Sequence, residues 1–568
     1  MKRFLTRPLR LPRLRPYVPE PDDPAIFWFN SERDDIIREV VRRVVERWGK
    51  DRSGLEYALN EVAFYETRRL EQQRDAEAKE QLGYWRGMLR RIARMSDEAK
   101  REALRGIAER MARDIAGNFD PRVYKLATSV APQLLTGMMR PAALPRDLAS
   151  LGLGARALDE MMRTEGEIDL LARLQKIGTL VYVPTHSSNL DSLALGYALH
   201  RSGLAPVVYG AGKNLFTNPI ISFFMHNLGA YRVDRRVRSN LYKDSLKSYS
   251  CVMIERGYHS LFFPGGTRSR SGMVERHLKL GLAGTALEAF SRNQVFGINR
   301  PVWFVPATIN YGMVLEAETL IEDHLKEHGQ ARYVIEDDEF SRIDRWVAFF
   351  RKLVGTEGAC VLRFGRPIDC FGNPVDDEGR SVAPGGRVVD PGTYVWRRGK
   401  PVLDGKRDAA YTREMGDVLL AAFRRETVLM ATHIVAHVLF RRLVRETPGV
   451  DLFGRLRFRG DVRLPREELI REVGEARDRA VELEARDGVR LNDFVRKRSP
   501  EEIVDRAQRI WEGYHTRMVA RQVNADVVIE DPTLLLYYQN RCLDYAVAMA
   551  GDEDLHAARE IALMGAQE

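Results

Sequence analysis

Six short apolar runs, separated by longer stretches of helical periodicity, constrain this chain more than any other feature. The runs are rich in β-branched and aromatic residues and occupy 179–183, 206–209, 230–233, 260–263, 302–309 and 360–364. Continuous apolar runs of this length are typical of strands that are buried on both faces of a parallel sheet. The alternation of strand and helix therefore predicts an α/β domain with a largely parallel sheet over residues 176–372.

Helical patterns flank this domain on both sides. Within residues 1–175, behind a basic N-terminal arm, apolar residues such as Ile37, Val40 and Val44 recur at three- and four-residue spacing among charged side chains. Residues 373–403 are rich in Gly, Pro, Asp and Arg, so we expect an exposed insertion or a linker there. Residues 404–568 have a helical pattern again.

The composition is that of a globular protein with a basic surface. The 568 residues are 44% hydrophobic and 30% charged, which excludes a collagen-like or wholly disordered chain. A formal net charge of +9 would attract the protein to polyanions or to an anionic membrane surface. We expect no nucleic-acid partner, because no recognised module and no stripe of interleaved basic and aromatic residues accompanies the charge.

The N-terminal arm is compatible with a membrane surface and equally with disorder. Residues 1–18 carry six basic side chains, no acidic one, and apolar residues between them. Such a segment can bind an anionic leaflet, with about 1 kcal/mol from each basic side chain, or it can be an ordinary disordered arm. No window of 18 apolar residues is present, so we expect no transmembrane helix.

Signals for secretion and for covalent or metal cross-links are missing from the sequence. Pro8, Pro12 and Pro16 interrupt any apolar core of a signal peptide, and the four cysteines include no pair at CxxC spacing. We therefore expect neither a zinc site nor disulfides, and a reducing compartment. Together with the basic arm, these features predict peripheral attachment to the cytoplasmic face of a membrane.

The most informative segment passes from an apolar strand through a polar turn into a helix, and it contains His186 and Asp191. Five positions along a continuous helix correspond to a rotation of about 500°, so the two side chains could not share a helix face. They can meet if His186 lies in the loop at the carboxyl end of the strand and Asp191 in the first helical turn. The carboxylate would then orient one imidazole nitrogen, and the other would take a proton from a substrate hydroxyl. The alternative is a helix cap without a chemical role.

Two further strand ends carry clustered arginines. Residues 262–272 contain two adjacent glycines, which allow close backbone approach, and Arg268 and Arg270, whose forked donors suit a phosphate. Residues 229–236 end another strand with a second arginine cluster. Basic loops at the strand ends imply an anionic substrate, although residues 262–272 are also compatible with a basic surface turn.

One histidine pair could be taken for a metal site. His433 and His437 are four residues apart on a predicted helix, but no third ligand lies nearby in the sequence. We therefore expect a packed pair on a helix, and we assign no metal.

Four ordered blocks of this domain resemble those of the glycerolipid acyltransferases, particularly the glycerol-3-phosphate and dihydroxyacetone-phosphate acyltransferases. The first is His-x4-Asp, from His186 to Asp191, and the second runs from Lys213 to Arg235. The third, usually Phe-Pro-Glu-Gly-Thr-Arg-Ser, reads Phe-Pro-Gly-Gly-Thr-Arg-Ser over 263–269. The fourth is the apolar strand 305–311, which contains a proline.

The resemblance implies transfer of a fatty acyl group from an acyl-CoA or acyl-carrier-protein thioester to the 1-hydroxyl of glycerol 3-phosphate, which makes lysophosphatidate for phospholipid synthesis. It implies that His186 is the general base and Asp191 its orienting partner, with no cofactor besides the acyl donor. The backbone amides of Gly265 and Gly266 are candidates for oxyanion or substrate contact. The candidate phosphate ligands are Arg235, Arg268, Arg270 and Lys213.

The sequence departs from the family pattern at two positions. Gly265 replaces the usual Glu of the third block, with no acidic residue after it until Glu275, and Asp234 replaces a usual arginine of the second block. The first departure motivates an alternative, a catalytically silent lipid-binding relative. The helical flanks favour the first acylation step, and dihydroxyacetone phosphate and lysophosphatidate are the alternative acceptors.

Overall fold

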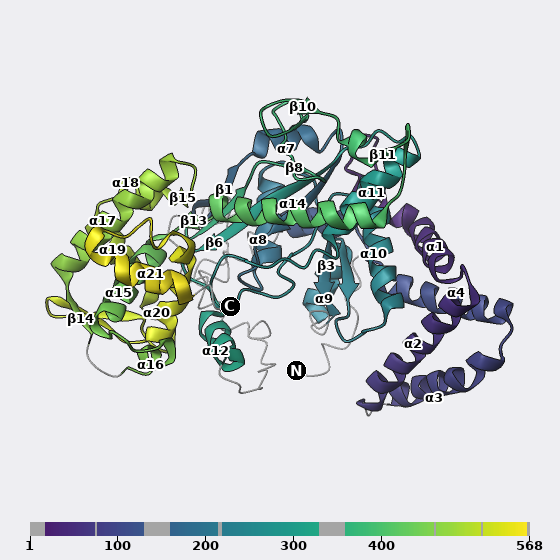
Figure 1. Cartoon of the computed structure of the whole chain (residues 1–568), viewed down its shortest axis with the longest axis horizontal. Coiled ribbons are helices and arrows are strands. Elements are labelled where there is room, and N and C mark those ends of the chain that lie inside the picture. The colour runs from purple at the N-terminus through teal and green to yellow at the C-terminus, as the bar shows by residue number, and fades with distance from the viewer. Residues whose placement is uncertain are drawn as a thin grey trace, which may run out of the picture.

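The structure, a computed structural model, describes residues 17–73, 76–129, 159–213, 219–328, 358–458, 462–512 and 515–564. The basic arm predicted over residues 1–18 thus lies outside the described residues except for its last two. Figure 1 shows the order of the parts: the N-terminal helices are at one end, a sheet lies in the middle, and the C-terminal helices form the other end. Within the described ranges, no helix combines the length and the apolar character needed to cross a bilayer.

An eight-stranded sheet forms the centre of the molecule, in the order β1-β7-β6-β2-β5-β3-β4 with β8 beside β6. Strand β2 is parallel to β5 and β6, and β3 is parallel to β4 and β5, whereas β7 and β8 are antiparallel to β6. This confirms the α/β fold with a largely parallel sheet. The bounds are β1 Met162–Gly166, β2 Thr179–Pro184, β3 Val208–Gly212, β4 Ala230–Val233, β5 Ser260–Leu261, β6 Val302–Tyr311, β7 Cys360–Phe364 and β8 Ile368–Asp369.

Strand β2 is apolar at every residue but the first, and it is buried on both of its faces. Leu180 and Tyr182 pack into one apolar cluster with α7 (Ile168–Leu174) and α8 (Asp191–Arg201). Val181 and Val183 pack on the opposite face, in a cluster with α10 (Asn240–Glu255), α11 (Ala283–Val295) and α14 (Gly405–Glu426). Because successive strand residues face opposite sides, a strand buried along its whole length needs helices on both faces of the sheet.

Four helices precede the sheet, and three of them, α1, α2 and α4, pack against α10. Arg43 of α1 forms an ion pair with Glu255 at 2.6 Å, and the Trp48 indole donates a hydrogen bond to Asp244 at 3.0 Å. These contacts attach the helical N-terminal region to the sheet domain. The helices are α1 Phe29–Trp48, α2 Arg52–Glu71, α3 Ala76–Arg91 and α4 Asp97–Ile115, with short 3-10 turns at Ala25–Trp28 and Ile92–Arg94.

The sheet begins earlier in the chain than the boundary expected at residue 176. Strand β1 pairs with β7 over five residues, from Met162 with Cys360 to Gly166 with Phe364. It lies at the edge of the sheet, and its sequence Met-Arg-Thr-Glu-Gly has no apolar run that would announce a strand. The boundaries 1–175, 176–372, 373–403 and 404–568 themselves stay a prediction.

Residues 373–403 form short antiparallel hairpins beyond β8. Strand β9 (Ser381–Val382) pairs with β10 (Val388–Val389), and β11 (Trp396–Arg397) pairs with β12 (Lys400–Pro401). A 3-10 turn at Pro391–Val395 joins the two hairpins. Val388 and Trp396 are exposed. In Figure 1 these hairpins project from the upper side of the sheet domain.

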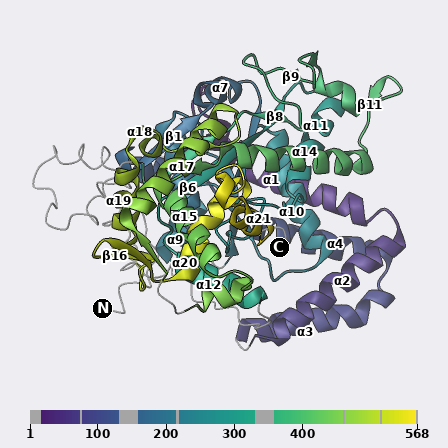
Figure 2. The same cartoon turned by 60° about the vertical axis from the view of Figure 1, so that its left-hand side comes forward.

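The C-terminal region is mainly helical, as the pattern predicts. The helices α15, α17, α19, α20 and α21 gather into one bundle, which Figure 2 brings forward. The helices after α14 are α15 Ala431–Glu446, α16 Leu452–Leu456, α17 Arg466–Ala485, α18 Asp493–Lys497, α19 Pro500–Trp511, α20 Pro532–Gln539 and α21 Leu555–Met564, with 3-10 turns at Asn540–Tyr545 and Asp552–Asp554. Short strands lie between them: β13 Val428–Leu429, β14 Arg463–Pro465, β15 Arg490–Leu491, β16 Ala520–Val523 and β17 Asp526–Ile529.

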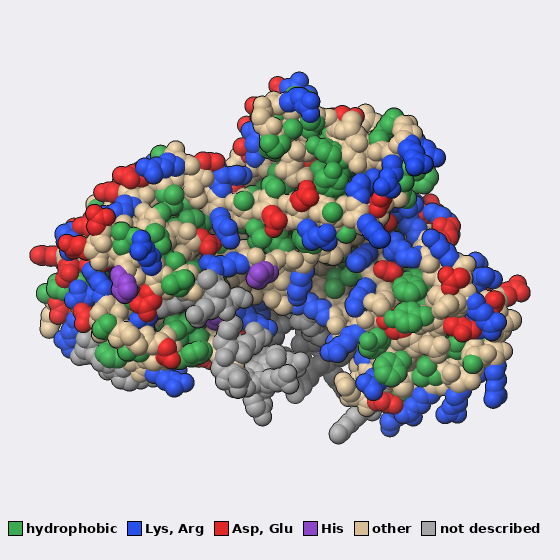
Figure 3. All heavy atoms as spheres, in the orientation of Figure 1, with side chains coloured by type: hydrophobic (Ala, Val, Ile, Leu, Met, Phe, Trp, Pro, Cys, Tyr) green, Lys and Arg blue, Asp and Glu red, His purple; other side chains and the backbone are tan. Residues whose placement is uncertain are grey.

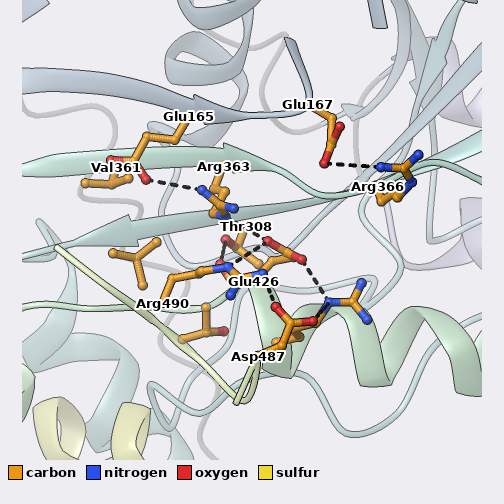
Figure 4. A network of polar contacts seen from close by, with 12 residues as sticks. Glu165, Glu167, Thr308, Val361, Arg363, Arg366, Glu426, Asp487 and Arg490 are labelled. Carbon is orange, nitrogen blue, oxygen red and sulfur yellow. Dashed lines mark hydrogen bonds and ion pairs between the residues drawn. The ribbon is translucent and has the colours of Figure 1, made fainter. Parts of the chain in front are cut away.

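A polar network around Glu426 joins this bundle to the sheet (Figure 4). Glu426 ends α14, and its carboxylate pairs with Arg363 of β7 at 2.7 Å and with Arg490 of β15 at 3.5 Å. Its backbone carbonyl accepts a hydrogen bond from the Thr308 hydroxyl of β6 at 2.7 Å. Because the carboxylate is buried, these partners are needed to offset its desolvation.

The histidine pair of the C-terminal region lies inside helix α15. His433 and His437 are buried, and burial lowers the pKa of each to about 3. The Met430 N–H donates a hydrogen bond to His433 Nδ1 at 3.1 Å. Both imidazoles thus lie in the interior of the helix bundle.

Candidate functional site

The predicted site residues follow the carboxyl ends of four neighbouring parallel strands. His186 follows β2, Arg268 follows β5, Lys213 follows β3 and Arg235 follows β4, and these strands are adjacent in that order. Neighbouring strands lie about 4.8 Å apart, so the four strand ends together span about 15 Å. The topology thus brings the three basic segments and the His-Asp segment to one edge of the sheet.

The imidazole of His186 and the carboxylate of Asp191 meet as the sequence predicts. The distance from His186 Nδ1 to Asp191 Oδ2 is 2.8 Å. His186 lies in the loop after β2, and Asp191 is the first residue of α8. Because an ionised carboxylate only accepts hydrogen bonds, Nδ1 carries the hydrogen and Nε2 is left with a lone pair. The His186 side chain is 18% exposed, so the ring is reachable from solvent.

Asp191 is fixed from several directions. Its side chain is fully buried, and Oδ2 also accepts the backbone N–H groups of Ser187 at 2.6 Å and Ser188 at 2.9 Å. The Tyr311 hydroxyl, at the end of β6, donates to Oδ1 at 2.8 Å. These hydrogen bonds fix the position of the carboxylate, which in turn holds the imidazole in one orientation.

Residues 262–279, which begin with the third block and are called the third-block loop from here on, also hold His186. The Ser269 N–H donates to the His186 carbonyl at 2.6 Å, and the His186 N–H donates to Glu275 Oε1 at 2.6 Å. The Phe263 ring stacks on the imidazole, with ring centroids 4.0 Å apart. Both the backbone and the ring of His186 are therefore placed by residues 263–275.

A second buried carboxylate, Glu316, connects the His186 loop to the third-block loop. Glu316 follows β6, and its oxygens accept the Ser188 hydroxyl at 2.8 Å and the Asn189 N–H at 3.0 Å. Arg268 pairs with the same carboxylate at 3.3 Å. Burial raises the pKa of Glu316, and the arginine opposes that shift. Arg268 thus has a structural partner in addition to any substrate.

The candidate phosphate ligands differ in how far their charge is already balanced. Lys213 lies between Asp114 of α4 at 3.1 Å and Asp234 at 3.6 Å. Arg235 is exposed and has no ion-pair partner among the described residues. Arg270 is partly buried in the same loop as Arg268. The net positive charge at this edge therefore lies mainly on the arginines, with Lys213 partly neutralised.

The two glycines of the third block are not equivalent. Gly266 has φ of +73°, and its N–H donates to the Phe263 carbonyl at 3.1 Å in a turn. The Lys279 side chain covers Gly266, since a Cβ there would lie 2.9 Å from Lys279 Nζ. Because the Gly266 amide is already used in the turn, Gly265 is the better candidate of the pair for contact with an oxyanion.

Contacts from the C-terminal region hold the far side of the third-block loop. The Asn540 side chain donates to the Ser271 carbonyl at 2.9 Å, and Arg276 forms an ion pair with Asp544 at 2.8 Å. Gly272 has φ of +81°, and a Cβ at that position would collide with the Tyr537 carbonyl oxygen. The loop that positions His186 is therefore itself positioned by residues more than 250 positions later in the chain.

Sequence reasoning missed the supporting residues of this site. Tyr311 lies inside the fourth block and Glu316 follows it closely. The block therefore pointed to this part of the chain, but it did not predict that these two side chains bind Asp191 and the His186 loop. Glu275 and Asp114 carried no local signal, because a single acidic residue in a charged chain is uninformative. Among the described residues, no three His, Cys, Asp or Glu side chains gather as a metal site would require.

The arrangement suits proton abstraction from a hydroxyl next to an anionic group. The imidazole is oriented through Nδ1, and a hydroxyl that reaches Nε2 would lose its proton to it. Arginines at the same edge would bind a phosphate on the molecule that carries the hydroxyl.

Comparison with known proteins identifies the domain that contains these residues. Residues 167–310, about a quarter of the chain, match the family model described as Acyltransferase. The glycerol-3-phosphate acyltransferase of Pseudomonas paraeruginosa is 34% identical over 159 residues, which are 27% of this chain and 18% of that protein. The enzyme of the same name from Haemophilus ducreyi is 33% identical over 190 residues, 33% of this chain and 22% of that protein.

The chain spans about a fifth of the length of the curated relatives it matches. Among solved structures, the 1-acyl-sn-glycerophosphate (LPA) acyltransferase of Thermotoga maritima is 15% identical. That match covers 44% of this chain and 84% of that chain, with a TM-score of 0.22.

Removal of the Tyr311 hydroxyl tests the buried hydrogen bonds of Asp191. We expect Tyr311→Phe to lower the free energy of unfolding by about 1.5–3 kcal/mol, because it removes a hydrogen bond to a buried charge. Tyr231→Phe is the matched control: its hydroxyl is buried without a hydrogen-bond partner among the described residues, so its loss is neutral or stabilising. Urea unfolding of both variants measures the difference, and equal effects would contradict the role assigned to Tyr311.

Proposed function

We propose, from the match of residues 167–310 to the Acyltransferase family model and from the similarity to relatives named glycerol-3-phosphate acyltransferase, that this protein is a glycerol-3-phosphate 1-O-acyltransferase. It would move a fatty acyl group from a CoA or acyl-carrier-protein thioester to the sn-1 hydroxyl and make lysophosphatidate for phospholipid synthesis. The observation that carries the proposal is the 2.8 Å contact between His186 Nδ1 and the buried Asp191 carboxylate, at the edge of the sheet that also carries the arginines.

The reaction follows from this geometry. Nε2 of His186 takes the proton of the sn-1 hydroxyl as the hydroxyl oxygen forms a bond to the thioester carbonyl carbon. The C–S bond then breaks, the electron pair leaves on sulfur, and the imidazolium returns the proton to the thiolate. Asp191 stabilises the imidazolium without taking its proton. A positioned base contributes about 10²- to 10⁴-fold in rate, so orientation of the substrates and oxyanion stabilisation supply the remainder.

The basic residues bind the phosphate of the acceptor in this proposal. Arg235 and Arg268 are the main ligands, because both carry forked donors at the ends of strands that lie on the same side of β2, Arg268 after the neighbouring β5 and Arg235 after β4. Arg270 and Lys213 are weaker candidates, and Lys213 already has two carboxylate neighbours. The Gly265 amide would donate to the oxyanion of the tetrahedral intermediate.

The alternatives to this function are an acyltransferase with another acceptor and a lipid-binding protein without catalytic activity. Dihydroxyacetone phosphate has the same phosphate on a similarly small body, whereas lysophosphatidate would need an apolar groove for its acyl chain. The relatives named glycerol-3-phosphate acyltransferases favour the first acceptor. A silent lipid-binding relative has no need of an oriented His186, and the tight hydrogen bonding of Asp191 argues against it.

Replacement of His186 should abolish transfer and leave the fold intact. In an assay of labelled acyl transfer to glycerol 3-phosphate, we expect His186→Ala to lower kcat by about 10²- to 10⁴-fold. His556→Ala, which removes an exposed imidazole on α21, is the matched control and should keep wild-type activity. Wild-type rates in His186→Ala would reject the mechanism, and transfer by the wild type to lysophosphatidate alone would reject the acceptor.

Arg235 should act on the acceptor and not on the acyl donor. We expect Arg235→Ala to raise the KM for glycerol 3-phosphate by about tenfold or more, because a charge-assisted contact to phosphate is lost. The KM for the acyl thioester should be unchanged. Arg238→Ala is the control, since Arg238 is another exposed arginine a few residues further along the chain. An effect of Arg235→Ala on both substrates, or on neither, would speak against a phosphate contact.

We also propose that the protein binds the cytoplasmic face of an anionic membrane peripherally, which would place the amphiphilic product directly beside lipid. Besides the basic net charge, support comes from the N-terminal helices, which expose Tyr57, Phe64 and Tyr84. The guanidinium of Arg68 lies 4.5 Å from the centroid of the Phe64 ring. In Figure 3, apolar and basic side chains lie together on these helices at the right of the view.

Sedimentation with lipid vesicles tests this attachment. We expect more protein to bind vesicles that contain anionic lipid than neutral vesicles, with the difference reduced by salt. Phe64→Ala should lower the bound fraction, whereas Val388→Ala, an exposed apolar residue of the β9–β10 hairpin, should not. Equal binding of wild type to both kinds of vesicle would argue against an anionic surface as the partner.

A further inference from the structure

The third-block loop places a carboxylate beside Gly265, where the family pattern has a glutamate in the sequence. A Cβ built on Gly265 would lie 3.5 Å from Glu275 Cγ and 4.0 Å from Glu275 Oε1. The Glu275 side chain therefore lies beside the point from which a side chain at residue 265 would extend. The acidic group that the sequence lacks at 265 is present in space, ten residues later in the chain.

The path of the loop explains this placement. The Lys279 N–H donates to the Pro264 carbonyl at 2.7 Å. This hydrogen bond closes the loop, so that Glu275 lies close to Gly265. The positive φ angles of this loop belong to Gly266 and Gly272, and Gly265 has none. The φ angle therefore does not require glycine at 265, and a Cβ there would need the Thr267 carbonyl oxygen, 3.3 Å away, to shift slightly. A larger side chain there would instead compete with Glu275 for the same space.

The two oxygens of Glu275 have different environments. Oε1 accepts the His186 N–H at 2.6 Å, whereas Oε2 is buried and has no hydrogen-bond partner among the described residues. Burial raises the pKa of this carboxyl group. A buried carboxylate oxygen without a partner is unfavourable, so a hydrogen-bond donor that reaches Oε2 would stabilise it.

We propose that Glu275 supplies the acceptor-binding carboxylate of this site in place of residue 265. Its Oε2 accepts a hydrogen bond from a hydroxyl of the polyol phosphate acceptor, while its Oε1 holds the backbone of His186. One carboxylate then fixes the acceptor and the general base relative to each other. The inference rests on the proposed function for the identity of the acceptor, and it removes the reason to regard Gly265 as a mark of inactivity.

Moving the carboxylate from residue 275 to residue 265 tests the proposal. In steady-state assays, we expect Glu275→Gln and Glu275→Gly to lower kcat/KM for glycerol 3-phosphate by about tenfold to a hundredfold, with the KM for the acyl donor unchanged. The double variant Gly265→Glu/Glu275→Gly should recover most of that loss, because it returns a carboxylate to the same space from residue 265. Glu378→Gln, which alters an exposed carboxylate on the hairpin segment, is the control and should match wild type.

A second double variant separates charge from volume. Gly265→Gln/Glu275→Gly fills the same space with an amide, so it should not recover activity if a carboxylate is needed. Recovery equal to that of the glutamate double variant, or an unchanged KM for the acceptor in Glu275→Gln, would overturn the inference. Thermal unfolding of every variant shows whether a loss of activity is a loss of fold. Activities are then compared only among variants that are fully folded at the assay temperature.

Calorimetric titration with glycerol 3-phosphate alone distinguishes this inference from the proposed function. Binding that weakens about tenfold or more in Glu275→Gln, without transfer by the wild type, would reject the proposed reaction and retain the role of Glu275 in acceptor binding. Normal transfer by the wild type, with binding that does not depend on Glu275, would reject the role of Glu275 and retain the reaction. A wild type that neither binds nor transfers would reject both.

Discussion

The buried carboxylate of Asp191 is the constraint on which the site depends. A buried charge is tolerated only when hydrogen bonds replace its lost hydration, and Asp191 obtains them from the His186 ring, two backbone N–H groups and the Tyr311 hydroxyl. Tyr311 is available because β2 and β6 are parallel neighbours in the sheet. The register of two strands thus fixes the acid, and the acid fixes the imidazole, which follows β2 at the same edge of the sheet as the basic loops.

Two further carboxylates extend this arrangement into the loops. Glu316 ties the residues after His186 to Arg268, and Glu275 ties the backbone of His186 to the third-block loop. The positive charges of the edge are therefore held in place by buried acids, and Arg235 is left exposed. Such a site is preorganised: little rearrangement is needed when a phosphate and a hydroxyl arrive, so more of the binding energy is available for catalysis.

The segment that resembles known acyltransferases does not contain every residue that builds the site. Asp114 of α4 reaches Lys213 from the N-terminal helices, and Asn540 and Asp544 hold the third-block loop from the C-terminal region. Glu316 also lies beyond residues 167–310. The flanking helices thus support the chemistry of the central domain as well as enclosing its core, which gives a physical reason for their presence in the same chain.

The sequence by itself determined the α/β class and the meeting of His186 with Asp191, because both follow from local rules: apolar runs for buried strands, and a strand-to-helix junction for the pair. It did not reveal β1, whose Met-Arg-Thr-Glu-Gly sequence suits the edge of a sheet and carries no apolar run. Nor did it reveal that Tyr311 and Glu316 serve Asp191 and the His186 loop, or that Glu275 lies beside Gly265. These are contacts between residues that are distant in the chain or on opposite arms of a loop, and only strand order and loop closure in the folded protein decide them.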